Sequence, residues 1–565
     1  MLDRQNLLEI QNLSISYSVV GQRVLAVDSV SLKLTKGEAL GIIGESGCGK
    51  SSLALGIMGL LDKAELSGKV LYKGQNLLEL NERKLKKYRW VDMAVVFQNS
   101  LEVLNPVLTI KEQIRDVIKT HYALSREEIE QKILGIFQML DLNAKWLNEY
   151  PHQLSGGMRQ KVLIAMALAC DPELLIVDEP TTSLDPLSKN EVIVLLNKLK
   201  KKMGFTMIVI SHDMEVIKKL SSRLITMYQG RFLELGFTEE VIRDPGHCYT
   251  RGLLNSSPEL FEYKDLWGIK GRVEENNSKG CIFYPRCPQR EQSCQDKKPE
   301  LKYIAVERMV ACHKGGIETL LRADRLKKSY QLTDHSSLEA LKGVDLEVKS
   351  GEVVALVGVS GSGKSTLAHL LTGIIPLDSG EIVFLGRELK GRWATKMIGG
   401  MQLVFQDPFA ATSARLSVLE VVREPLDIIG WQDTFAREKK AVKLLKEVEL
   451  PVTAAFLNRP CRNLSGGQRQ RIAIARSMVT EPSLLIADEI TSMLDPSIQA
   501  NILRKLKGLQ NSQGFSMLYI THNFKLARKL ADRVYVLQEG KIVEKGISSE
   551  VLSKAADVYH QQLCQ

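Results

Sequence analysis

Two glycine-rich segments of this sequence have the residue types and spacing needed to hold a nucleoside triphosphate. They are GESGCGKS (44–51) and GVSGSGKS (358–365), and both fit the pattern G-x-x-x-x-G-K-[ST]. Glycines let the backbone curl so that its N–H groups point at phosphate oxygens, and the following helix adds a positive N-terminal dipole. Lys50 and Lys364 are then expected to reach the β- and γ-phosphates, and Ser51 and Ser365 to hold Mg²⁺. The residues expected to bind nucleotide here are Gly44, Ser46, Gly47, Cys48, Gly49, Lys50, Ser51 and Ser52, and Gly358, Ser360, Gly361, Ser362, Gly363, Lys364, Ser365 and Thr366.

An acidic pair follows an apolar run in each half of the chain. Asp178 and Asp488 each end such a run, where a carboxylate at the C-terminal edge of a sheet can face the metal. The next residues, Glu179 and Glu489, are placed to polarise the attacking water. An acidic pair after a strand more often serves as a cap or turn, but its position downstream of a P-loop favours the catalytic role.

The same motifs occur twice, in the same order. LSGGMRQK recurs as LSGGQRQR, LLIVDE as LLIADE, and VISHD as YITHN, each 310 residues later. A nearly constant spacing indicates two copies of one domain rather than chance matches of short motifs. Residues 259–318 match neither copy. We therefore expect a first cassette over 1–258, a cysteine-rich insert over 259–318 and a second cassette over 319–565.

Each copy alternates short apolar runs with amphipathic stretches, which is typical of an α/β fold with a buried parallel sheet. The expected strands are Ala39–Ile43, Leu174–Val177, Thr206–Ile210, Val353–Val357, Leu484–Ala487 and Ser516–Ile520. The expected helices after the repeated LSGG segment are Met158–Cys170 and Gln468–Met478.

Composition excludes several classes of protein. The 565 residues are 44% hydrophobic and 25% charged, as in globular proteins, and no run approaches the roughly 18 apolar residues that span a bilayer. The N-terminus does not resemble a secretory signal, so we expect a cytosolic protein. A formal charge of +10 without a dense basic block gives little support for nucleic-acid binding. Nine cysteines in such a chain do not indicate a disulfide framework.

The LSGGM and LSGGQ segments resemble the signature of ABC ATPases, and this resemblance covers nearly the whole chain. It implies two tandem P-loop cassettes, each a parallel-sheet core with a helical signature subdomain, that close head to tail over two ATP molecules. Ser465 and Gly467 would then face the ATP held by Lys50, and Ser155 and Gly157 the ATP held by Lys364. The signature residues are Ser155, Gly156, Gly157, Ser465, Gly466 and Gly467.

The same resemblance assigns roles to residues outside these motifs. Tyr17 and Tyr330 would stack on adenine, with core packing as the alternative, and Gln98 and Gln406 would sense Mg²⁺ and the γ-phosphate and contact a permease. Asp185 and Asp495 fit the D-loop, and His212 and His522 the switch histidine. The second copy departs from the family at Ile490, where proline is usual, and at Asn523, which replaces an acidic residue. Neither departure removes a catalytic group.

Both copies resemble the ATPases of the peptide/nickel-uptake branch, here fused into one chain. This implies two transmembrane permeases, an extracytoplasmic substrate-binding protein and a peripheral position on the cytoplasmic face of the inner membrane. The alternatives are an exporter ATPase, and a soluble tandem-cassette factor that acts on ribosomes or nucleic acid.

Four cysteines lie in the insert: Cys281, Cys287, Cys294 and Cys312. Four thiolates in a cytosolic protein suit zinc or an iron–sulfur cluster. Their spacing resembles the tail of dipeptide-importer ATPases, which implies a [4Fe–4S] cluster. Zinc, with His313 as a further ligand, and thiols without metal remain alternatives.

Overall fold

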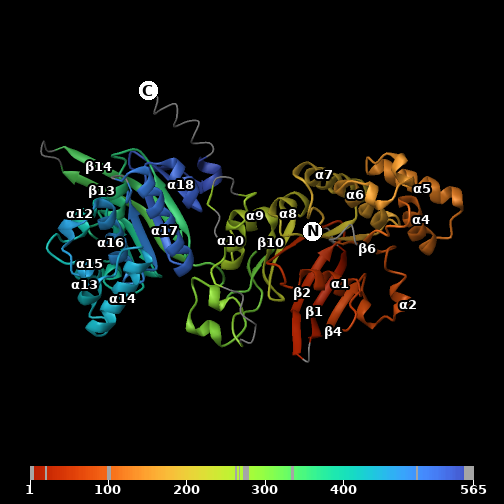
Figure 1. Ribbon diagram of the computed structural model, residues 1–565, viewed down its shortest axis with the longest axis horizontal. Helices are drawn as coiled ribbons and strands as arrows, with labels where there is room; N and C mark the ends of the chain where they lie inside the picture. The colour runs from red at the N-terminus through yellow and green to blue at the C-terminus, as the bar shows by residue number, and fades with distance from the viewer. Residues whose placement is uncertain are drawn as a thin grey trace, which may run out of the picture. The chain divides into compact units, whose positions relative to one another are not determined.

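The computed structural model describes residues 5–19, 22–97, 103–260, 264–265, 268–271, 279–331, 336–491 and 494–552. It divides into two compact units, shown in Figure 1. The first comprises 1–260, 275–283 and 293–316, and the second comprises 261–274, 284–292 and 317–565. Both units thus take stretches of the segment 259–318, and the division of the chain into three domains stays a prediction.

In the first unit, the described residues form a mixed sheet and a separate antiparallel sheet. The mixed sheet has the order β11-β12-β10-β9-β3-β8-β7-β6, and the antiparallel sheet β2-β1-β4-β5. Neighbours from β9 to β6 are parallel, whereas β10, β12 and β11 add an antiparallel edge. The strands are β1 (Asn6–Val19), β2 (Gln22–Thr35), β3 (Ala39–Ile43), β4 (Ala64–Tyr72), β5 (Gln75–Asn76), β6 (Met93–Val96), β7 (Leu174–Asp178), β8 (Thr206–Ile210), β9 (Arg223–Tyr228), β10 (Arg231–Phe237), β11 (Lys302–Ala305) and β12 (Arg308–Val310).

The helices of the first unit fall into two groups. α4, α5 and α6 contact one another and lie together on one side of the unit, whereas α1 packs against β1, β2 and β7 (Figure 1). Apolar side chains of α1 join both sheets in one core. The helices are α1 (Lys50–Ile57), α2 (Glu82–Leu85), α4 (Ile110–His121), α5 (Arg126–Met139), α6 (Gly156–Leu168), α7 (Pro186–Met203), α8 (Met214–Leu220), α9 (Thr238–Arg243) and α10 (Cys248–Asn255).

The second unit repeats this plan with the sheets β18-β19-β20-β15-β21-β22 and β14-β13-β16-β17. Its strands are β13 (Thr319–Gln331), β14 (Ser337–Lys349), β15 (Val353–Val357), β16 (Ser379–Phe384), β17 (Arg387–Glu388), β18 (Met401–Val404), β19 (Leu484–Asp488), β20 (Ser516–Thr521), β21 (Arg533–Gln538) and β22 (Lys541–Ile547). Its helices are α11 (Lys364–Leu371), α12 (Pro408–Ala411), α13 (Val418–Ile429), α14 (Thr434–Glu447), α15 (Ala454–Leu457), α16 (Gly466–Met478), α17 (Pro496–Gln513) and α18 (Phe524–Leu530).

The two predicted cassettes of α/β architecture are confirmed. All six expected strands are present, and every residue of β3, β7, β8, β15, β19 and β20 is buried, as parallel strands covered on both faces should be. The expected helices after the LSGG segments begin two residues earlier than predicted, at Gly156 and Gly466. The antiparallel sheets were not predicted, because their half-exposed strands lack a continuous apolar run.

No helix in the described part of the chain is long and apolar enough to span a bilayer.

A buried ion pair ties β12, which lies in the segment 259–318, to the sheet of the first unit. Glu234 on β10 has no exposed surface, and its Oε1 accepts a hydrogen bond from Nη2 of Arg308 at 3.1 Å. The backbone N–H groups of Gly246 and His247 donate to the same carboxylate at 2.7 and 2.9 Å. Burial raises the pKa of Glu234, and the bonds from Gly246 and the neighbouring residues oppose that rise. The ionised form of Glu234 therefore depends on these partners.

Replacing Arg308 with alanine should destabilise the first unit, because the buried carboxylate of Glu234 would lose its cationic partner. We expect Arg308→Ala to lower the free energy of unfolding by about 3–5 kcal/mol. Lys298→Ala is the matched control: its partner Asp28 lies at 2.8 Å, but the lysine side chain is one-third exposed, so the expected loss is about 0–1 kcal/mol. Urea unfolding measures both, and equal losses would contradict the assignment.

Candidate functional site

The first P-loop joins β3 to α1 through a turn that leaves no room for side chains at two glycines. A Cβ on Gly44 would lie 2.2 Å from the carbonyl oxygen of Met227, and one on Gly49 would lie 2.1 Å from that of Ala26. Gly49 also has a φ of 103°, a conformation that favours glycine. The turn therefore requires glycine at both positions, and it leads directly into the N-terminus of α1.

The second P-loop repeats this geometry between β15 and α11. A Cβ on Gly358 would lie 2.3 Å from the carbonyl oxygen of Leu537, and one on Gly363, at a φ of 106°, would lie 2.6 Å from that of Ala340. The two turns are thus built in the same way on different neighbouring residues. Both present backbone N–H groups at the start of a helix, which suits an anion.

The P-loop lysines are buried and hold their own loops. Nζ of Lys50 donates to the carbonyl oxygens of Gly44 and Glu45 at 2.8 and 3.0 Å. Nζ of Lys364 donates to those of Gly358 and Val359 at 3.0 and 2.9 Å. Each ammonium group is therefore held over the concave side of its loop, where a phosphate would lie.

The acidic residues that end β7 and β19 fit a magnesium site. Burial raises the pKa of Asp178 and of Asp488, while hydrogen bonds from Ser51 and Ser365 oppose the rise. In both aspartates Oδ1 is buried and has no hydrogen-bond partner. Mg²⁺ in phosphate sites takes one or two protein oxygens and completes its shell with phosphates and water. The buried Oδ1 atoms and the two serines are therefore suited to hold Mg²⁺ with ATP.

The glutamates that follow occupy a strained backbone conformation and contact the predicted switch histidines. Glu179 has a φ of 52° and Glu489 a φ of 46°, in the left-handed region. His212 Nδ1 lies 2.8 Å from Glu179 Oε2, and His522 Nδ1 lies 3.3 Å from Glu489 Oε1. Strained residues of this kind persist where the surroundings hold them, often at functional sites. Each glutamate is thus paired with a histidine from the end of the next strand.

The remaining contacts of the glutamates differ between the units. Thr182 Oγ1 donates to Glu179 Oε2 at 3.0 Å, a contact that sequence reasoning missed. Gln406 Nε2 donates to Glu489 Oε2 at 3.1 Å, and Lys364 lies 3.6 Å from Glu489 Oε1. Gln406 thus lies beside Glu489, and its role as a Q-loop residue stays a prediction, whereas Gln98 falls outside the described residues. The only sequence signal for this contact of Thr182 is that a hydroxyl residue stands three positions after Glu179.

The signature and D-loop residues cap helices. Ser155 and Ser465 are the N-caps of α6 and α16, and each hydroxyl accepts a backbone N–H three residues on at 3.3 Å. Asp185 and Asp495 cap α7 and α17 in the same way. Among the described residues, no hydrogen bond or ion pair joins a signature serine to the P-loop of its own unit.

The predicted adenine-stacking tyrosines lie beside the P-loops or on the surface. Tyr17 on β1 packs partly against the core, and its hydroxyl donates to Ser52 Oγ at 3.2 Å. Tyr330 on β13 is 37% exposed, with Nζ of Lys328 at 5.8 Å from its ring centre. Both rings retain exposed surface on which a base could stack.

The four cysteines of the insert are not assembled into a metal site. Within the residues that the structure describes, no group of three or more His, Cys, Asp or Glu side chains could hold a metal ion. Cys281, Cys294 and Cys312 belong to the first unit, and Cys287 to the second. Nε2 of His313 lies 2.7 Å from the carbonyl oxygen of Lys297. The structure therefore supports neither the predicted [4Fe–4S] cluster nor the zinc alternative.

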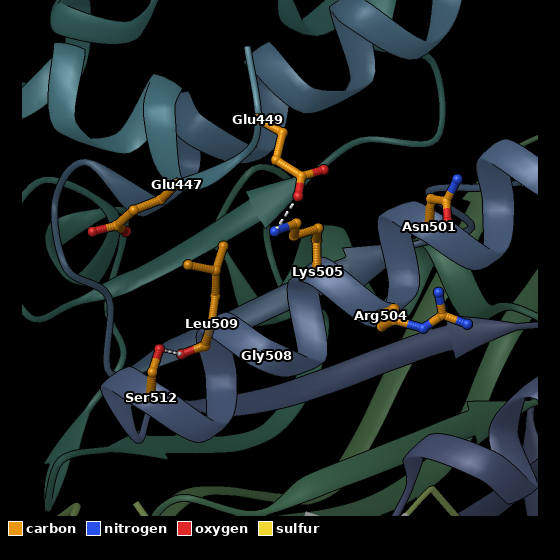
Figure 2. Close-up of a pocket in the computed structure, with 8 residues that line it drawn as sticks. All are labelled: Glu447, Glu449, Asn501, Arg504, Lys505, Gly508, Leu509 and Ser512. Atoms are coloured by element: carbon orange, nitrogen blue, oxygen red, sulfur yellow. Dashed lines mark hydrogen bonds and ion pairs between the residues drawn. The ribbon is translucent and has the colours of Figure 1, made fainter. Parts of the chain in front are cut away.

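One surface hollow of about 570 Å³ lies in the second unit, on α17 (Figure 2). Nζ of Lys505 points across it to Oε1 of Glu449 at 2.5 Å. The lining residues are Glu447, Glu449, Asn501, Arg504, Lys505, Gly508, Leu509 and Ser512. None of them is a predicted site residue, so the hollow is not assigned to nucleotide.

Comparison with known proteins agrees with this geometry. The model of the family "ABC transporter" matches residues 27–182 and 341–492, and that of "Oligopeptide/dipeptide transporter, C-terminal region" matches 233–294. The chain is 35% identical to the peptidoglycan transport ATP-binding protein YejF of Agrobacterium fabrum, over 99% of this chain and 96% of that protein. It is also 35% identical to the glutathione import ATP-binding protein GsiA of Escherichia coli, over 100% of this chain and 89% of that protein.

Replacing the paired glutamates should separate nucleotide binding from turnover. Glu179→Gln with Glu489→Gln keeps the size of each side chain but removes the carboxylate that we expect to polarise water, so ATP hydrolysis should fall by about 10²–10⁴-fold. ATP affinity should change little. Phosphate release and equilibrium binding of a fluorescent ATP analogue measure the two quantities. Glu191→Gln, an exposed change on α7, is the control; full turnover by the double variant would contradict the assigned role.

Proposed function

The chain belongs to the ABC transporter family, and from that premise we propose that it powers the uptake of peptides or a related small substrate through partner permeases. It is an ABC-type transporter ATPase, and the relatives place it with importer ATPases of the oligopeptide and glutathione type. The observation that carries the proposal is a P-loop lysine and a buried metal-facing aspartate in each of the two units, in a chain that also matches the oligopeptide/dipeptide transporter region over residues 233–294. Nickel chelates and metallophores are further candidate substrates.

Equivalent residues of the two sites would have the same roles in ATP hydrolysis. Nζ of Lys50 and of Lys364 would release its hydrogen bonds to the loop carbonyl oxygens and bind the β- and γ-phosphates of ATP instead. Asp178 with Ser51, and Asp488 with Ser365, would hold Mg²⁺, which neutralises charge on the phosphates during transfer. Glu179 and Glu489 would then orient and polarise the attacking water, and His212 and His522 would hold the glutamates in place.

The signature residues are proposed to act on the ATP of the opposite cassette. Ser465 and Gly467 would contact the ATP bound at Lys50, and Ser155 and Gly157 the ATP bound at Lys364. The N-cap position of both serines supports this, because the N-terminus of a helix attracts the negative γ-phosphate. ATP would thereby favour a closed pair of cassettes.

Transport would follow from the difference between open and closed pairs. ATP binding shifts the population towards the closed pair, the permeases change their access, and hydrolysis restores the open pair. Gln98 and Gln406 would carry this change to two permeases on the cytoplasmic face of the inner membrane. An extracytoplasmic binding protein would deliver the substrate. No metal in the cysteine segment is required at any step.

The proposed action across cassettes predicts that Ser465→Ala slows turnover at the Lys50 site. In a Glu489→Gln background, where the first site supplies the hydrolysis, we expect a fall of at least about ten-fold, since the variant removes a γ-phosphate donor. Ser155→Ala in the same background should have a smaller effect. Single-turnover hydrolysis distinguishes the two, and a larger effect of Ser155→Ala would contradict the proposal.

The proposed importer predicts that tagged protein, extracted from its host membrane in mild detergent, carries two permease subunits. A double variant, Lys50→Ala with Lys364→Ala, should still bring down the permeases but should abolish uptake of labelled peptide, since both phosphate-binding ammonium groups are lost. Mass spectrometry of the purified complex and an uptake assay measure these outcomes. Recovery of ribosomal particles without permeases would favour the soluble tandem-cassette factor instead.

A further inference from the structure

One tyrosine hydroxyl fastens the first P-loop to helix α10. Tyr249 is fully buried, and its hydroxyl accepts a hydrogen bond from the backbone N–H of Glu45 at 2.8 Å. The same hydroxyl donates to the carbonyl oxygen of Met227 at 3.2 Å. Burial raises the pKa of Tyr249, so the hydroxyl keeps the proton that it donates. The contact joins residues that are 204 positions apart in the chain.

The peptide group held by Tyr249 is the one that holds the P-loop lysine. Its N–H belongs to Glu45, and its carbonyl belongs to Gly44, which accepts a hydrogen bond from Nζ of Lys50 at 2.8 Å. Because a peptide group is planar, fixing the N–H also fixes the direction of the carbonyl. Tyr249 therefore sets, from outside the P-loop, the orientation of an acceptor for the phosphate-binding ammonium group.

The ring of Tyr249 packs against a side chain from residues 259–318, here called the cysteine-bearing segment. Phe283, two residues after Cys281, is 1% exposed, and its ring centre lies 5.6 Å from that of Tyr249 and 5.5 Å from that of Tyr228. The rings of Tyr228 and Tyr249 are 4.7 Å apart. Such contacts stabilise aromatic pairs beyond the burial of their surface. All three rings belong to the first unit.

We propose that Tyr249 is a positioning residue for the first ATP site, and that Phe283 makes the affinity of this site for ATP depend on the cysteine-bearing segment. The inference rests on the proposed function, because it concerns ATP bound at Lys50. It is limited to the first site: among the described residues of the second unit, no tyrosine hydroxyl bonds the N–H of Val359, the counterpart of Glu45.

The decisive variant is Tyr249→Phe, which removes the hydroxyl and keeps the ring. We would place it in a Lys364→Ala background, so that titration of the full chain with a fluorescent ATP analogue reports the first site. The Kd should rise about five-fold, the effect of one hydrogen bond, with a smaller change in kcat. Hydrogen exchange of the peptide containing Glu45 should also become faster.

Tyr72→Phe is the matched control, because it removes an equally buried hydroxyl from the same unit. The Tyr72 hydroxyl donates to the carbonyl oxygen of Asp92 at 3.3 Å, and neither residue is in the P-loop. This variant should lower the melting temperature as much as Tyr249→Phe but leave the Kd for the ATP analogue unchanged. A purely structural role of Tyr249 would instead give the two variants the same result.

Phe283→Leu tests the link to the cysteine-bearing segment. It keeps an apolar side chain under the tyrosine but removes the ring contact, and we expect a two- to three-fold rise in the Kd, on the order of one lost aromatic contact. A lower melting temperature with an unchanged Kd would show that Phe283 only packs, and would remove the segment from the proposal. If Tyr249→Phe does not fold, the Kd of Phe283→Leu and hydrogen exchange at Glu45 in that variant test the proposal instead.

The outcomes separate this inference from the proposed function. If the Lys364→Ala parent neither binds the analogue nor hydrolyses ATP, the proposed function fails and the inference fails with it. If the parent binds it and Tyr249→Phe binds equally well with unchanged exchange at Glu45, the inference alone is overturned.

Discussion

The nucleotide chemistry of this protein depends on a backbone turn that has no room for a Cβ at its ends. At Gly44 and Gly49 the carbonyl oxygens of neighbouring strands lie 2.1–2.2 Å from where a Cβ would be, and Gly358 and Gly363 are almost as confined. Any side chain would push the loop outwards and move the lysine that bonds its carbonyls. The sheet, the helix and the phosphate cradle are therefore one packed unit.

One electrostatic and one conformational cost lie beside this turn. Asp178 and Asp488 keep a buried Oδ1 without a partner, which is expensive unless a cation or water satisfies it. Glu179 and Glu489 hold a left-handed backbone that is unfavourable for a side chain. The two copies repeat these features but differ in the side chains around the glutamate. The repeated part is what ATP and Mg²⁺ would contact.

Much of the fold and of each site follows from local patterns. Apolar runs of four or five residues predicted the central strands, because a parallel strand covered on both faces needs apolar residues throughout. The P-loops were also predicted from a local pattern, because their glycines and lysine have a fixed spacing and all belong to one turn. The LSGG helices were placed two residues late because the two glycines after each capping serine were taken as part of the preceding turn, whereas they are the first residues of the helix.

The sequence by itself determined the duplication, the phosphate loops, the central strands and the acidic residues at their ends, because each depends on residues close together in the chain. Only the tertiary structure decided that Arg308 reaches Glu234 and that Tyr249 reaches Glu45. It also left the four cysteines without a metal-binding arrangement among the described residues, although their resemblance to the tail of dipeptide-importer ATPases had implied a cluster. Such contacts depend on the path of the backbone between distant segments. The pairing and packing of the sheets fix that path, and the spacing of residues along the chain does not encode it.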